Sequence, residues 1–437
     1  MRSGAHNIRI SFTGSLFTHF GGVYLIHEFL RNLRFRSFLH EYVRFPQRNN
    51  DFTLSELLLA LLYPMILGLE RIEVSALLNT NGVFRYITGL RRFPDPQTLR
   101  RFLVRAAPVV LPQLRSAHDR LRSHFLRLPT MPSSFWLDCD STARTLYGKQ
   151  QEGVVKGYNP NHPGKKSYHP LIITEGHRGD CLAGALRFGN AHTADGVEHL
   201  LARVRTLLPH RERLRLRADC GFYNGSFIAD IRRDTEFAVI AKMTKPIKER
   251  IASLKYADAP HGFATATFAY HPQGWNRDER FIALRRELPQ EEGDEQTTLF
   301  TLEKYAYSVM VSNLPLLPYQ AFSFYGDRMG MERIIRILKE DYLFGTAPTG
   351  DFDANALYAE ISMLAYNLII WFKRLCLPDD WQSCTLPVIR RRLLMIPGEF
   401  VRAHNVPILR FAESNPYKEA FVSARRRIRK LEPLIGK

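Results

Sequence analysis

Hydrophobic residues in the first third of the chain recur every three or four positions. This periodicity is typical of helices that bury one face. Asp95 followed by Pro96 is a typical helix start, because the carboxylate caps free N–H groups and proline fits the first turn. We therefore expect a helical N-terminal region over residues 1–130, with helices at 22–43, 54–70, 97–106 and 111–127.

From residue 134 the pattern changes to short runs of β-branched and aromatic residues separated by turns. The order of these runs and of the amphipathic stretches between them predicts β-β-β-α-β-α-β, starting with the strand SFWLDCD. Further strand-like pieces follow between residues 245 and 300, and then a strand-like YAYSVMVSNL. These changes divide the rest of the chain into four parts. A core in two parts, 131–243 and 301–376, encloses a β-rich insertion at 244–300 and is followed by a basic C-terminal segment at 377–437.

The stretch YGDRMGMERIIRILK places four polar residues at offsets of 0, 3, 7 and 14. On one helix, these positions lie within about 60° of one another along roughly 21 Å of axis. The isoleucines and leucine fall on the opposite half, so the spacing predicts an amphipathic helix. Spacing alone leaves open whether the polar stripe is a solvated face or a binding surface. Its members are Tyr325, Arg328, Glu332 and Lys339.

Charge narrows the range of partners. The 437 residues contain 61 Lys and Arg against 43 Asp and Glu, a net charge of +18. Such an excess favours polyanions, either nucleic acid or an anionic membrane surface. The uncharged apolar runs are too short to span a bilayer, and the N-terminus lacks the apolar core of a signal peptide. We therefore expect no membrane association and a location inside the cell.

The five cysteines are scattered and include no C-x-x-C pair. This pattern argues against a disulfide framework and against a structural zinc site. We expect reduced thiols.

Two aspartates end predicted strands. Asp140 ends the first strand and Asp219 the fourth, and these strands are commonly neighbours in a β-β-β-α-β arrangement. Carboxylates gathered at one edge suit Mg²⁺ or Mn²⁺, and two such ions can promote phosphoryl transfer. Glu332 is the candidate third ligand. Asp138 competes with Asp140, because residues i and i+2 on a strand face the same way, and a single Asp at a strand end more often caps a turn.

The polar stripe also resembles the YREK signature of bacterial insertion-sequence transposases of the DDE type. The resemblance extends to Asp140 in its D-S-T context and to Asp219 in D-x-G-F-Y. The segment YGKQQEGVVKGYNPNHPGKKSYHPL, residues 147–171, is similar to the insertion-sequence-1380 family. Together these matches cover residues 135–375.

The resemblance implies an α/β fold: an RNase H-like catalytic core, with a mixed five-stranded sheet and flanking helices, interrupted by a β-rich insertion. The helical region over residues 1–130 that precedes the core is then expected to bind DNA. It implies cut-and-paste transposition with two Mg²⁺ or Mn²⁺ ions on Asp140, Asp219 and Glu332. The implied partner is double-stranded DNA, both terminal inverted repeats and target, bound by a homodimer. The implied location is the bacterial cytoplasm, at the nucleoid when bound to DNA.

The resemblance also assigns DNA contacts. Tyr325, Arg328 and Lys339 match positions that contact phosphates near the cleavage site. Trp275 matches an insertion aromatic that stacks on a flipped base, although local core packing is the alternative. Lys165 and Lys166, in a turn-rich loop, are candidate phosphate contacts or a solvated hairpin tip.

Two other functions remain open from the sequence. The first is a nuclease of the same fold that cleaves DNA without joining it. The second is a non-catalytic DNA-binding protein derived from a transposase, which the intact acidic positions disfavour.

Overall fold

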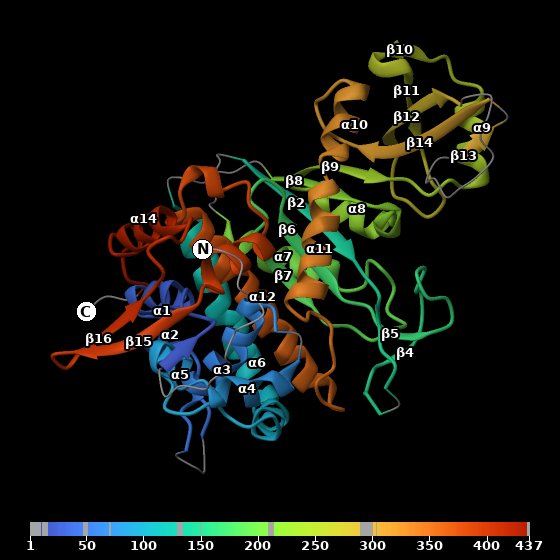
Figure 1. Ribbon diagram of the computed structural model, residues 1–437. Helices are drawn as coiled ribbons and strands as arrows, with labels where there is room; N and C mark the ends of the chain where they lie inside the picture. Colours follow the sequence, from blue (N-terminus) through green and yellow to red (C-terminus); the bar gives the residue numbers. More distant parts are fainter. Residues whose placement is uncertain are drawn as a thin grey trace. The chain divides into compact units, whose positions relative to one another are not determined.

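The computed structural model describes residues 10, 16–46, 51–69, 71–128, 134–148, 150–208, 214–288, 300–302 and 304–434 (Figure 1). The chain forms two compact units. Unit 1 contains Met1–Glu41, Pro46–Arg101 and Trp371–Lys437, and unit 2 contains Tyr42–Phe45 and Phe102–Ile370. The division falls within two long helices, α6 (Pro96–Leu126) and α12 (Phe352–Cys376).

Unit 2 is built on a ten-stranded sheet with the order β10-β11-β12-β14-β9-β8-β2-β6-β7, in which β13 also pairs with β14. Five of its strands come from the predicted β-β-β-α-β-α-β segment: β2 (Phe135–Ser141), β6 (Leu171–Glu175), β7 (Cys181–Ala185), β8 (Leu214–Ala218) and β9 (Thr235–Ile240). β2 is antiparallel to β6 and parallel to β8, and β8 is parallel to β9. The mixed α/β fold with the RNase H-like arrangement is therefore confirmed.

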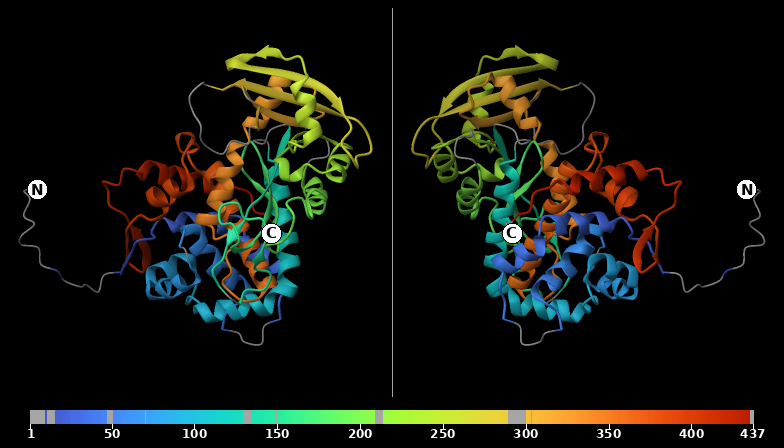
Figure 2. Two further views of the ribbon diagram at one scale, coloured as in Figure 1. Left: turned by 90° about the vertical axis from the view of Figure 1, so that its right-hand side faces the viewer. Right: turned by 90° about the vertical axis from the view of Figure 1, so that its left-hand side faces the viewer.

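The insertion extends this sheet. Its strands pair antiparallel, β10 with β11 and β11 with β12, and β12 then pairs with β14, which lies next to β9. Figures 1 and 2 show these yellow and orange strands at one end of the sheet. The predicted β-rich pieces correspond to β10 (Ala257–Ala259), β11 (Phe263–Tyr270) and β12 (Glu279–Glu287), and the core resumes with β13 (Phe300–Leu302) and β14 (Tyr305–Ser312).

Helices cover both faces of the sheet. One face packs its alternating apolar residues, including Leu137, Cys139 and Leu216, against α7 (Val197–Leu207), α8 (Gly225–Ile231) and α9 (Lys245–Ala252). On the other face, α10 (Pro318–Gly326) packs Ala321 and Phe324 over β9, β12 and β14. The apolar face of α11 (Met329–Asp341) buries Met331, Ile335 and Leu338.

The helix predicted over YGDRMGMERIIRILK is wrong in one respect. Tyr325 belongs to α10, whereas Glu332 and Lys339 belong to α11, and Arg328 is the N-cap of α11. The turn between the helices is tight, because Arg328 N–H donates to the Tyr325 carbonyl oxygen three residues back. Gly326 and Gly330 flank this turn, and glycine costs about 1 kcal/mol relative to alanine inside a helix.

The helices predicted at 97–106 and 111–127 are one continuous helix, α6, which contains Pro108 and Pro112. Both prolines lie on its exposed side, so the carbonyl groups that lose N–H partners can reach solvent. A continuous buried stripe from Leu99 to Phe125 stabilises the helix across them. In contrast, the segment 22–43 breaks at Arg34, whose φ is +54°, into α1 (Val23–Asn32) and α2 (Phe35–Tyr42).

A small three-stranded sheet follows the end of β2. It has the order β3-β5-β4, with β3 (Arg144–Thr145), β4 (Val155–Lys156) and β5 (Lys166–Tyr168), and both pairings are antiparallel. Asn159 ties its loop to this sheet by donating to Thr145 Oγ1 over 2.9 Å.

Unit 1 joins the two ends of the chain. Strand β1 (Leu16–Thr18) pairs with β15 (Gly398–Ala403), which pairs with β16 (Val406–Arg410). The Asn32 amide donates to the Ile428 carbonyl at the end of α14 (Lys418–Ile428). Its other elements are α3 (Leu54–Leu67), η2 (Ile72–Val74), α4 (Ser75–Thr80), α5 (Gly82–Thr88), η5 (Asp379–Trp381), α13 (Leu386–Ile389) and η6 (Arg390–Leu394).

Helix α3 shows how local sequence defines an element of unit 1. Thr53 and Glu56 form a capping box at its start, and Gly68 ends it in the left-handed conformation with φ of +70°. Among the described residues, no helix is long and apolar enough to cross a membrane.

Candidate active site

Two neighbouring parallel strands place Asp140 and Asp219 at the same edge of the sheet. The register of β2 and β8 pairs Cys139 with Ala218, so the next residue on each strand is one of the two aspartates. The predicted neighbourhood of the first and fourth strands is thereby confirmed. Each aspartate has one oxygen held by a backbone N–H: Asp140 Oδ1 accepts from Ser141 over 2.7 Å, and Asp219 Oδ1 accepts from Gly221 over 2.9 Å.

Arg328 joins the start of α11 to the end of β2. Its Nη2 lies 2.9 Å from Asp140 Oδ2 and donates to the Cys139 carbonyl oxygen over 3.0 Å. The Arg328 side chain is buried, with 7% of the residue exposed. Because Arg328 caps α11, this contact brings the first turn of the helix, which carries Glu332, to the edge where the aspartates lie.

The electrostatics show that the acidic groups gather there. Burial, with the carboxylates of Asp219 and Glu332, raises the pKa of Asp140 to about 6, while Arg328 opposes the rise. Burial alone would lower the pKa of Arg328, but Asp140 and Asp219 raise it. Three carboxylates and one guanidinium therefore interact at the carboxyl ends of β2 and β8.

Asp138 has a different environment from Asp140. Both of its oxygens bind Arg217, Oδ1 to Nε over 2.6 Å and Oδ2 to Nη2 over 2.8 Å, and both side chains are buried. Arg217 also donates to the Phe324 carbonyl oxygen of α10 over 2.8 Å. Arg217 holds both oxygens of Asp138, whose side chain is 3% exposed, whereas Arg328 contacts one oxygen of Asp140, whose side chain is 13% exposed. Asp138 is therefore the poorer of the two candidate ligands.

Tyr325 and Lys339 are the first and last residues of the polar stripe, near the end of α10 and in the last turn of α11. Burial raises the pKa of Tyr325 to about 12, and Arg328 beside it opposes this rise. Lys339 Nζ donates to Thr142 Oγ1 over 3.1 Å and to the Ala143 carbonyl oxygen over 2.9 Å. Residues of the polar stripe thus contact the end of β2 and the segment after it, although the stripe comes from two helices.

The other predicted DNA contacts lie on different elements. Lys165 and Lys166 are exposed at the start of β5, in the small sheet that follows β2. Trp275 is partly buried in the insertion, with its ring centroid 5.0 Å from Tyr223 and 6.4 Å from Phe281. Tyr223 follows Asp219 by four residues, so Trp275 lies beside the segment that leaves β8.

Sequence reasoning missed His169 at this edge. The His169 ring is buried and has two hydrogen-bond partners. Its Nε2 lies 3.1 Å from Ser141 Oγ, and its Nδ1 lies 2.7 Å from the Ala191 carbonyl oxygen. That carbonyl can only accept, so Nδ1 carries the proton and Nε2 accepts from Ser141. The residue stands in the segment SYHPL, but nothing in its spacing from Asp140 identifies it.

The donor set is suited to a divalent cation. Asp140, Asp219 and Glu332 offer only oxygen ligands, and their mutual repulsion is the condition that a bound cation relieves. Within the described part of the chain, no three His, Cys, Asp or Glu side chains converge closely enough to hold a metal ion. In this conformation, Arg328 supplies the positive charge next to Asp140.

Comparisons with known proteins identify the family of the chain. No curated protein matches the chain significantly. A solved structure of a piggyBac transposase synaptic complex with hairpin DNA is similar at 11% identity and a TM-score of 0.44, over 81% of this chain and 74% of that one. Residues 2–433 match the family described as transposase DDE domain group 1. Since this match spans nearly the whole sequence, the chain belongs to the DDE transposases and is an enzyme of the polynucleotidyl transferase and endonuclease type.

Proposed function

We propose that this chain is the transposase of a bacterial insertion sequence and moves its element by cut-and-paste transposition. It would cleave double-stranded DNA at terminal inverted repeats and join the 3′-hydroxyl ends to target DNA. The observation that carries this proposal is the register of β2 and β8, which places Asp140 and Asp219 side by side at one sheet edge. Glu332 supports it, because its carboxylate acts on the pKa of Asp140. The spacing of Tyr325, Arg328, Glu332 and Lys339 supports assignment to the group with the YREK signature, most like the insertion-sequence-1380 family.

Asp140, Asp219 and Glu332 would hold two Mg²⁺ or Mn²⁺ ions. When bound, such ions activate the attacking oxygen and stabilise the leaving oxygen of an in-line phosphoryl transfer. The protein's own contribution is to orient these carboxylates. Backbone N–H groups fix Oδ1 of each aspartate. A ligand would take the other oxygen, which in Asp140 is the one that faces Arg328.

Phosphate contacts would come from Tyr325, Arg328 and Lys339. A tyrosine hydroxyl carries its proton at neutral pH and can donate it to a phosphate oxygen. Burial, which raises the pKa of Tyr325 to about 12, keeps the proton in place at alkaline pH as well. Arg328 can bind a phosphate in a bidentate manner. Lys165 and Lys166 would contact the backbone further along, where both are exposed.

Trp275 would stack on a base near the cleaved end. Its partial burial against Tyr223 and Phe281 fixes the indole beside the Asp219 segment. The assembled form on DNA would be a homodimer, acting in the bacterial cytoplasm at the nucleoid.

The test is metal-dependent cleavage of a labelled duplex that carries the sequence flanking the gene. Wild type with Mg²⁺ should produce 3′ ends at the repeat boundary, and Glu332→Gln should produce none. Glu249→Gln, which removes an exposed carboxylate from α9, is the control and should cut like wild type. Cleavage without strand joining would identify a nuclease, and binding without cleavage by the wild type would identify a non-catalytic DNA-binding protein.

A further inference from the structure

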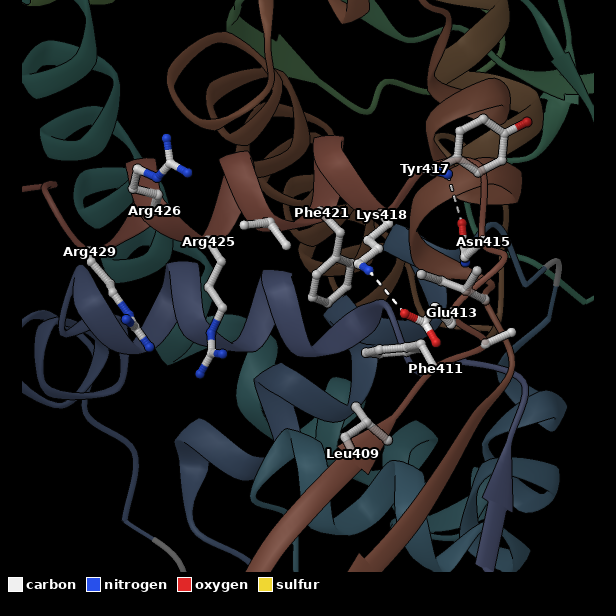
Figure 3. Close-up of a pocket in the computed structure, with 13 residues that line it drawn as sticks. Leu409, Phe411, Glu413, Asn415, Tyr417, Lys418, Phe421, Arg425, Arg426 and Arg429 are labelled. Atoms are coloured by element: carbon white, nitrogen blue, oxygen red, sulfur yellow. Dashed lines mark hydrogen bonds and ion pairs between the residues drawn. The ribbon is translucent and has the colours of Figure 1, made fainter.

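A cavity of about 590 Å³ lies along the arginine-rich helix α14 in unit 1 (Figure 3). Strand β16 and the segment that follows it form the other wall. Its lining combines apolar side chains with cationic ones: Ile396, Leu409, Phe411, Ala412, Glu413, Asn415, Tyr417, Lys418, Phe421, Val422, Arg425, Arg426 and Arg429.

A second cavity, of about 630 Å³, adjoins the first. Tyr417 and Arg426 line both cavities, so the two are neighbours at these residues. The second cavity adds Trp381 and Arg392. We call the two cavities together the α14 groove.

Aromatic rings recur along the α14 groove. The centroids of Phe411 and Phe421 lie 5.0 Å apart, and those of Trp381 and Tyr417 lie 5.7 Å apart. Phe411, Phe421 and Tyr417 are partly exposed, and Val422 between them is 46% exposed. Trp381 is buried, so the flat apolar surfaces open to a ligand are those of Phe411, Phe421 and Tyr417.

Cationic side chains also line the α14 groove. Lys418, Val422, Arg426 and Arg429 lie at offsets of 0, 4, 8 and 11, which is one face of α14 over about 16 Å. Arg426 and Arg429 are exposed. Arg425 differs, because its Nε lies 3.0 Å from Glu28 Oε2 and its charge is compensated within unit 1.

The surrounding segment is basic as well. Residues 377–437 contain twelve Lys and Arg against six Asp and Glu. Glu413 of the first cavity lies 4.0 Å from Lys418, and Asp380 and Glu419 line the second cavity. Against these three acidic residues the groove lining has five Lys and Arg. The groove thus complements a polyanion.

We propose that the α14 groove binds a single strand of DNA, with bases against Phe411 and Phe421 and phosphates on Arg426 and Arg429. Proteins that bind single strands combine a basic groove with aromatic side chains on which bases stack. In a duplex the bases are paired inside the helix, so only the phosphates could contact the groove and the rings of Phe411 and Phe421 would have no base to stack on. This inference rests on the proposed function, in which DNA is the substrate.

The first experiment measures binding of a fluorescein-labelled oligothymidylate of about 12 nucleotides, within the ~4–16 nucleotides of known single-strand sites. The double variant Arg426→Ala/Arg429→Ala should bind about tenfold more weakly, and the slope of log K against log salt should fall by about 1.4, or about 0.7 for each lost phosphate contact. The control is Arg402→Ala/Arg410→Ala, which removes two exposed arginines of β15 and β16 that do not line either cavity. An equal effect of the two double variants would overturn the proposal.

The second experiment uses the same oligonucleotide with 5-iododeoxyuridine, photo-crosslinked to the full-length protein and mapped by mass spectrometry. Crosslinks at Phe411, Phe421, Tyr417 or Trp381 are expected, and crosslinks confined to other segments would overturn the proposal. It would also be overturned if a duplex of equal length, or polyglutamate, displaced the oligonucleotide at lower concentration than unlabelled oligothymidylate.

The two proposals fail separately. Crosslinking should be unchanged in Glu332→Gln, because strand binding at α14 does not require cleavage. If metal-dependent cleavage is normal but no crosslinks form at α14, only the proposal for the α14 groove is wrong. If crosslinks form at α14 but no cleavage occurs, only the proposed cleavage is wrong.

Discussion

Arg328 and Asp140 form a buried ion pair at the edge of the catalytic sheet, with Nη2 2.9 Å from Oδ2. The same nitrogen donates to the Cys139 carbonyl oxygen on the strand that carries Asp140. Since Ser141 N–H holds the other oxygen of Asp140, the oxygen that faces Arg328 is the one left for a metal ligand. The guanidinium and the proposed metal ion would therefore compete for one carboxylate oxygen.

Replacement of Arg328 should separate metal binding from catalysis. We expect Arg328→Ala to bind Mn²⁺ more tightly than wild type when DNA is absent, because Asp140 Oδ2 loses its partner. Cleavage should nevertheless fall by about 10²–10³-fold, since the group proposed to stabilise charge on the phosphate is lost. Titration with Mn²⁺ followed by electron paramagnetic resonance measures the first effect, and duplex cleavage measures the second.

Arg333→Ala is the matched control, because Arg333 is an exposed arginine one residue beyond Glu332 on the same helix. It removes the same charge without touching Asp140. Equal Mn²⁺ affinities for wild type and Arg328→Ala would show that the ion pair does not oppose metal binding.

Asp138 and Asp140 should respond differently to the same substitution. Asp138→Asn leaves Arg217 buried without its carboxylate, and we expect a loss of about 3–5 kcal/mol in stability. Asp140→Asn should keep the fold and abolish cleavage. Thermal unfolding and duplex cleavage, measured for both variants, check the assignment, and a stable, inactive Asp138→Asn with an active Asp140→Asn would reverse it.

Lys339 should contribute one phosphate contact. Its side chain reaches the loop after β2 through Thr142 and Ala143, close to the proposed path of the DNA. We expect Lys339→Ala to reduce the slope of log K against log salt by about 1 in duplex binding. Arg336→Ala on the same helix, which removes an exposed cation, is the comparison. Identical slopes for wild type and Lys339→Ala would place Lys339 away from the DNA.

Sequence patterns predicted the core of unit 2 well because its strands are short, apolar and separated by turns. The pairing of β2 with β8 followed from element order, and this pairing brings Asp140 and Asp219 together. Periodicity did not predict the break at Asp327. The φ angles of Asp327, −63°, and Arg328, −65°, remain near helical values, and the break consists of a shift of the hydrogen bonds to three-residue spacing. The Asp138–Arg217 pair also depends on tertiary contact, since its partners are 79 residues apart.

The joining of the two chain ends in unit 1 was likewise beyond local pattern. β1 has only three residues, and its partner β15 begins at Gly398. Such a short strand carries too few alternating positions to be recognised, and long-range pairing leaves no periodic signal in either segment. In the same way, α6 crosses Pro108 and Pro112 because tertiary packing outweighs the local cost of proline.

A buried histidine of unit 2 should make stability depend on pH. His118 on α6 lies 2.7 Å from Glu360 of α12 through Nδ1, and Asn367 donates to its Nε2 over 2.8 Å. Nε2 is therefore an acceptor, and Nδ1 donates to the carboxylate. Burial, with Arg122 nearby, lowers the pKa of His118 from 6.5 to about 4, so the folded protein holds this ring neutral.

In the unfolded chain His118 takes up a proton near pH 6.5, and in the folded chain only near pH 4. The unfolded state thus binds more protons between these values, and the stability that is present above pH 6.5 is lost as the pH falls. From pH 7.5 to 5 the loss is about 2 kcal/mol for this one group. The pKa of Glu360 is depressed below its ordinary 4.5, since His118 and Arg122 outweigh its burial, so its contribution is lost only at lower pH.

The measurement is urea unfolding of wild type and His118→Gln at pH 7.5 and pH 5. Wild type should lose about 2 kcal/mol more than the variant over this interval, whatever constant stability the substitution itself removes. His261→Gln, at an exposed position of the insertion, should keep the wild-type pH dependence. If His118→Gln shows the same pH dependence as wild type, His118 is not the group that titrates, and another group must account for the acid sensitivity of this unit.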